Sequence, residues 1–208
     1  MKKILNLIGL QFETVFSLKK MIAIIFVIAS FYAFIDPSLI TITGLLFLMA
    51  TCYTTAFYEE KSKSNYLIRS LPIRAKDYIL SRYIYVAINT LISILLTTVL
   101  YKVFIYFELI NKNESLSLWL LGIIVGVIGI FMMSIVTPLE LLLGFEKGRI
   151  VIIFLTLSPM VFANFLLNYI PLINLNSLMV KILILLCLIT LILTSYFITS
   201  NLYAKKDL

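Results

Sequence analysis

The residue types that carry out most enzyme chemistry are scarce in this sequence. None of the 208 residues is a histidine, which removes the commonest general base and the commonest metal ligand. The two cysteines, Cys52 and Cys187, lie within apolar segments, where a thiol behaves as a small hydrophobic group. No phosphate-binding loop of the form G-x-x-x-x-G-K-[ST] occurs. The sequence therefore predicts no catalytic site, no metal site and no cofactor bound by this chain.

The acidic residues lie at the ends of apolar segments. Asp36, Glu108 and Glu114 lie at ends expected on the outer side of the membrane, and Glu140 lies at an end expected on the inner side. A proton relay across a membrane uses carboxylates within the apolar segments. This placement argues against an ion-coupled transporter.

Uncharged polar residues recur every four positions inside two of the apolar segments. They are Tyr85, Asn89, Ser93 and Thr97 in one segment and Thr51 and Thr55 in the other. Such a row lines a translocation path or makes hydrogen bonds between helices, which contribute about 0.6 kcal/mol each on average. Both interpretations stay open. Gly122 and Gly126, with Gly129 nearby, predict a small-residue face for close helix packing.

The composition indicates which elements hold these residues. Hydrophobic residues make up 62% of the chain and charged residues 13%, too few to cover a soluble domain. Segments of about 20 apolar residues are typical of membrane-spanning helices. We expect an all-α integral membrane protein, a single transmembrane domain over residues 1–208 with six spans. The spans are expected at 21–35, 39–58, 83–101, 116–139, 150–167 and 178–201.

The basic residues predict the orientation. Of the 17 Lys and Arg residues, 14 fall on the side of the N-terminus, and only Lys102, Lys112 and Lys181 fall on the other side. Cytoplasmic loops carry the Lys and Arg excess, so both termini are expected in the cytoplasm. The net charge of +7 follows the membrane boundary, so we expect lipid and no nucleic acid as a partner.

Residues 2–20 predict an amphipathic helix that lies along the membrane surface. Lys2, Asn6 and Glu13 recur on one face and Ile4, Ile8 and Phe12 on the other. A simple topogenic leader is the alternative.

Two segments between spans are charged. The first, residues 59–77, starts with Glu59, Glu60 and Lys61, continues through Leu67, Ile68 and Leu71 on one face of a short helix, and reaches Pro72. Because Pro72 disfavours a helical conformation at Leu71, the next helix is expected to begin near Arg74. The second segment, residues 140–149, follows Pro138, which ends or kinks the fourth span. Each segment is either a contact for a soluble partner or a connector that only sets topology.

These segments resemble the loops of small bacterial type-2 ABC export permeases. That family shows an acidic pair followed by Lys, then serine-leucine-proline, then basic and acidic residues before the next span. The corresponding stretches here are Phe57-Tyr58-Glu59-Glu60-Lys61, Ser70-Leu71-Pro72, Ile73 through Tyr83, and Gly144-Phe145-Glu146-Lys147-Gly148-Arg149. The six-span layout and the leading helix agree, so the resemblance covers essentially the whole chain.

The resemblance implies a permease of the bacterial cell membrane that pairs with an identical or paralogous permease. Two separate ATPase subunits would bind ATP and Mg²⁺. A narrower similarity is to Gram-positive exporters of amphipathic peptides. The residues implied in the ATPase contact are Glu59, Glu60, Lys61, Leu67, Ile68, Leu71, Pro72, Arg74, Asp77, Phe145, Glu146, Lys147 and Arg149.

Two other functions are compatible with the sequence. One is a transporter or channel that needs no ATPase, and the other is an immunity or sensing protein that binds a peptide without moving it. Efflux from vesicles with and without ATP would separate the three.

Overall fold

The computed structural model describes residues 2–35, 40–63, 73–107, 118–148, 150, 151, 154 and 178–205, and all the regular elements within them are helices. These are α1 (Lys2–Ser17), α2 (Lys19–Ile35), α3 (Ile40–Lys61), α5 (Ala75–Tyr106), α6 (Leu118–Phe131), the π-helix η2 (Met132–Val136), α7 (Thr137–Leu143) and α9 (Leu178–Ala204).

Four stretches of the described chain are long and apolar enough to cross a membrane. They are Ile40–Lys61, Ala75–Tyr106, Leu121–Leu143 and Leu186–Ala204. A fifth candidate is the pair Lys3–Ser17 and Lys19–Ile35, which is bent by 68° at residue 18. The expected all-helical membrane class is confirmed. Most of the expected span 150–167 lies outside the described residues, so the count of six stays a prediction.

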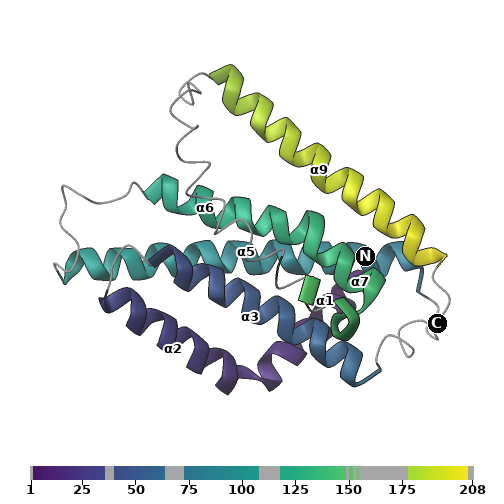
Figure 1. Cartoon of the computed structure of the whole chain (residues 1–208), viewed down its shortest axis with the longest axis horizontal. Coiled ribbons are helices and arrows are strands. Elements are labelled where there is room, and N and C mark those ends of the chain that lie inside the picture. The colour runs from purple at the N-terminus through teal and green to yellow at the C-terminus, as the bar shows by residue number, and fades with distance from the viewer. Residues whose placement is uncertain are drawn as a thin grey trace.

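The longest helix, α5, forms the centre of the bundle (Figure 1). It packs against α1, α3, α6 and α9, while α2 packs on α3. Helix α9 contacts α5, η2 and α7 and diverges from the bundle toward its N-terminal end (Figure 1). The end of α3, the start of α5, α7 and the end of α9 gather at one end of the molecule, which we call the charged end.

Helix α5 begins where the sequence predicts it. Arg74 is extended, with φ −72° and ψ 142°, and the first helical residue is Ala75. The helix then runs for 32 residues, about 48 Å at 1.5 Å per residue. That exceeds a hydrocarbon core of roughly 30 Å. Helix α5 is therefore longer than the expected span 83–101.

Pro138 does not end the fourth span, because a π-helical turn precedes it and the helix continues to Leu143. Proline has no N–H to donate to the carbonyl four residues earlier, here that of Ser134. That carbonyl accepts a hydrogen bond from the Ser195 hydroxyl of α9 (2.8 Å). The Thr137 hydroxyl donates to the Met132 carbonyl (2.9 Å). Pro138 thus creates an attachment point for α9.

Helix α1 is amphipathic as expected, but it turns much of its apolar face toward the bundle. Leu7, Ile8 and Gln11 are buried, and the Phe12 ring meets the Tyr85 ring edge-on at 5.1 Å. Its position along a membrane surface stays a prediction.

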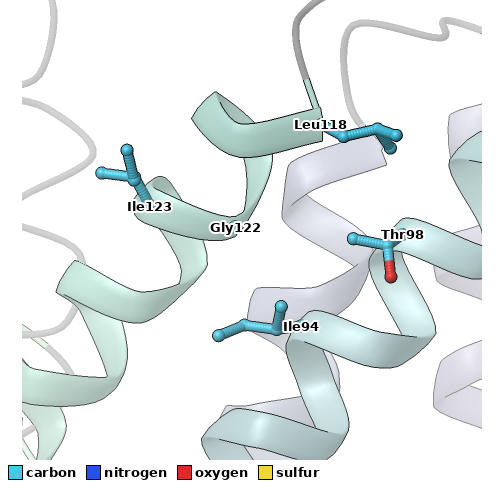
Figure 2. Close-up of a pocket in the computed structure, with 5 residues that line it drawn as sticks. All are labelled: Ile94, Thr98, Leu118, Gly122 and Ile123. Carbon is cyan, nitrogen blue, oxygen red and sulfur yellow. The ribbon is translucent and has the colours of Figure 1, made fainter.

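Of the three glycines in the expected small-residue face, only Gly129 packs closely, and Gly44 on α3 is a second close contact. A Cβ atom on Gly122 or Gly126 would be 3.8 or 3.9 Å from the Ile94 side chain, an ordinary contact. Figure 2 shows Gly122 and Ile94 beside a shallow apolar groove between α6 and α5. A Cβ atom on Gly129 would instead overlap the Thr90 side chain, and one on Gly44 would overlap Thr97.

Gly129→Ala should therefore destabilise the protein by about 1–3 kcal/mol, the usual cost of overpacking. Thermal unfolding of the purified chain in detergent measures the effect. Gly126→Ala, three residues away on the same helix, is the matched control and should unfold at or above the wild-type temperature. Equal effects of the two variants would contradict this packing.

Candidate functional site at the charged end

A buried ion pair joins α3 to α5. The Arg82 guanidinium lies 3.1 Å from a Glu59 carboxylate oxygen, and the two side chains are only 3% and 13% exposed. The Tyr78 hydroxyl donates a hydrogen bond of 3.0 Å to the same oxygen. The Arg82 guanidinium also lies 6.0 Å from the centre of the Tyr85 ring. Residues from three successive turns of α5 thus hold the Glu59 side chain or the guanidinium that pairs with it.

Burial makes this pair a strict constraint on the fold. Removing one partner of a buried pair typically costs about 3–5 kcal/mol, because it leaves the other charge uncompensated. The pair therefore specifies how α3 and α5 meet. The net contribution of the ion pair to stability is smaller than this cost, because both charges lose hydration when they are buried.

The neighbouring Glu60 joins α3 to the segment after α7. Its carboxylate accepts a hydrogen bond of 2.8 Å from the Glu146 backbone N–H. Gly144 makes the approach possible, because it has φ +82° and a Cβ atom there would lie 2.9 Å from the Glu60 carboxylate. Only glycine adopts such a backbone readily. Glu59 thus connects α3 to α5, and Glu60 connects α3 to the segment after α7.

Aromatic rings cover the outside of this junction. The Phe145 ring lies 5.8 Å from Tyr53 and 6.0 Å from Phe57, both on α3. The Lys61 ammonium lies 5.8 Å from the centre of the Phe57 ring. Phe57 is 38% exposed, and Phe145 is half-buried. We call Phe57, Lys61 and Phe145 the aromatic patch.

A family model described as "ABC-2 family transporter protein" matches residues 6–204. The chain belongs to this family. Its members are membrane components of ABC transporters and are distinct from the ATPase. The resemblance to ABC-2 permeases is therefore confirmed at the level of the family, and the chain is a multi-pass membrane protein. No curated protein and no solved structure matches it.

The structure of this ABC-2 permease brings together part of the expected ATPase contact. Glu59 is buried in the ion pair, while Arg74, Glu146 and Lys147 are exposed and Asp77 is half-buried. The expected contact residues outside the described part of the chain are Leu67, Ile68, Leu71, Pro72 and Arg149. The role of the whole set stays a prediction.

The expected path residues lie buried in the interface between α3 and α5 of the permease. Two of them bond across it, since Tyr85 donates to the Thr51 carbonyl (3.1 Å) and Ser93 donates to the Gly44 carbonyl.

The others bond mainly within their own helices, and Thr55 and Asn89 also lie against the Tyr85 hydroxyl. Thr51, Thr55 and Thr97 donate within their own helices, and the Asn89 amide nitrogen makes no hydrogen bond. This arrangement favours the interpretation as interhelical hydrogen bonding; a role in a path stays a prediction.

Arg82 is not among the site residues expected from the sequence. It counts among the basic residues that set orientation, whereas the structure buries it. Tyr78, Arg82 and Tyr85 recur at helical spacing, which was the available signal. Glu140 lies near one end of the candidate span Leu121–Leu143, and its side chain is only 9% exposed. Within the described residues no cluster of potential ligands fits a metal ion.

Glu60→Ala should release the segment after α7. Loss of a hydrogen bond to a charged group should raise amide exchange across residues 144–148 by about tenfold, without changing exchange in the middle of α3. Hydrogen-exchange mass spectrometry of the protein in lipid nanodiscs measures this. Lys61→Ala, one residue along, is the control and should leave residues 144–148 protected. Unchanged protection in Glu60→Ala would contradict the proposed connection.

Proposed function

We propose that this ABC-2 permease is the transmembrane subunit of an ATP-driven exporter in a bacterial cell membrane. It works with separate ATPase subunits, which bind ATP and Mg²⁺, and with a second permease, either a copy of itself or a paralogue. The charged end and both termini face the cytoplasm. The excess of Lys and Arg on that side supports this orientation.

The hydrogen bond from the Glu146 N–H to Glu60 carries the proposal. It joins the two segments of the chain that the sequence separately marks as contacts for a soluble partner. The aromatic patch lies across the same junction. Partly exposed aromatic residues beside charged ones are typical of protein interfaces. One ATPase subunit therefore contacts both segments together.

The connection to the bundle explains how a movement of the ATPase reaches the membrane. Glu59 ties α3 to the first turns of α5, and Gly144 follows α7 directly. A displacement at the patch is therefore passed to three helices. ATP supplies the driving force through its different affinities for the two states of the ATPase.

The proposed substrate is an amphipathic peptide or another hydrophobic compound. The similarity to Gram-positive peptide exporters supports this class. Separation of α3 from α5 would open a path along Tyr85, Asn89, Ser93 and Thr97, since Tyr85 and Ser93 bond across that interface.

Phe145→Ala should weaken the ATPase contact without unfolding the permease. Alanine substitution at a central interface aromatic typically costs about 2 kcal/mol or more, so retention of the ATPase on the purified permease should fall by more than about tenfold. ATP-dependent efflux from vesicles should fall with it. Both are measured after co-expression with a candidate ABC ATPase subunit.

Phe31→Ala is the matched control, because Phe31 is 65% exposed on α2, three residues before Phe34, which packs on Phe104 near the end of α5 opposite to Arg82. It should retain the ATPase and the efflux. Wild-type retention of the ATPase by Phe145→Ala would exclude this contact, and efflux without any ATPase would exclude the function.

A further inference from the structure

Among the residues that the structure describes, two buried polar atoms at the charged end have no hydrogen-bond partner. One is a terminal guanidinium nitrogen of Arg82, Nη1, and the other is a carboxylate oxygen of Glu140, Oε1. The two side chains are 3% and 9% exposed. Burying a charged group without its hydrogen bonds is costly. An unsatisfied group of this kind calls for an explanation.

The two groups belong to one electrostatic cluster. Arg82 interacts with the Glu59 carboxylate of α3 and also with the Glu140 carboxylate of α7. The two carboxylates repel each other. In this structure Arg82 holds Glu59 through its other terminal nitrogen. One guanidinium thus lies close enough to two acidic side chains to interact with both, and it makes an ion pair with Glu59.

Helix α7, which carries Glu140, is a short segment, and the regular α-helix is interrupted at both of its ends. The π-helix Met132–Val136 precedes it, and Gly144 with φ +82° follows it. π-Helical turns are rare, and they occur frequently at functional sites. Pro138 removes one hydrogen bond of the helical ladder in the first turn of α7. Helix α7 can therefore shift without disrupting a regular helix on either side.

We propose that Arg82 is a positioning residue that exchanges partners, holding Glu59 in the state seen here and Glu140 in a second state of the permease. In the second state, Arg82 Nη1 and Glu140 Oε1 would form a hydrogen bond with each other. The exchange also ties a shift of α7 to the release of α3. Since the segment after α7 carries Phe145, the exchange would link the ATPase contact to the bundle; that consequence, unlike the exchange, rests on the proposed function.

Spin labels at Leu143 and Leu95 test the exchange in the permease alone. Leu143 is 47% exposed on α7 and Leu95 is 64% exposed on α5. The labels are attached to cysteines at these positions after Cys52→Ser and Cys187→Ser substitution, and the protein is placed in lipid nanodiscs. Double electron–electron resonance then measures the distribution of distances between α7 and α5.

The wild type should give one main distance. Glu59→Gln should raise a second distance population by about tenfold, because Arg82 loses its charged partner on α3. Adding Glu140→Gln to that variant should remove the second population. An unchanged distribution in Glu59→Gln, or a shift that persists in the double variant, would overturn the exchange.

Tyr78→Phe provides a milder perturbation should Glu59→Gln not yield a monodisperse protein. It removes only the hydrogen bond from Tyr78 to Glu59, so it should shift the distribution in the same direction by a smaller factor. No shift in Tyr78→Phe would then count against the exchange. The measurement contains no ATPase, so failure of the proposed ATPase contact would leave its result unaffected.

Discussion

A buried guanidinium must be neutralised, and the charged end of this permease is organised around that requirement. Arg82 lies on α5 with only 3% of its side chain exposed, and Glu59 of α3 supplies the counter-charge. Tyr78 supports the same carboxylate oxygen. Because both side chains are buried, water cannot readily replace a lost partner. The relative placement of α3 and α5 therefore follows from one electrostatic constraint.

The other contacts at this end extend from the ion pair. Glu60, the next residue on α3, holds the segment after α7 through the Glu146 N–H. The Tyr83 hydroxyl, next to Arg82 in sequence, lies 2.7 Å from the Ser195 hydroxyl of α9, which in turn donates to the Ser134 carbonyl. Four helices are thus linked by polar contacts near one end. The remaining faces of α2 and α9 expose large apolar residues, as expected for helices that face lipid.

The sequence predicts the helices better than it predicts their contacts. The start of α5 near Arg74 and the membrane class follow from proline, charge and length, which act locally. The burial of Arg82 and the close packing at Gly129 depend on which helix lies alongside. In a membrane protein, a helix face toward lipid and a helix face toward another helix have similar apolar patterns. The sequence alone therefore does not distinguish the two faces.

A double-mutant cycle on Glu59 and Arg82 tests the central constraint most directly. The free energy of unfolding is measured in mixed micelles for Glu59→Gln, Arg82→Gln and the double variant. Each single variant removes one member of the Glu59–Arg82 pair and leaves the other without it, whereas the double variant removes both. The account predicts a coupling energy of about 3 kcal/mol, with the double variant more stable than the sum of the single effects implies. Additive effects would contradict it.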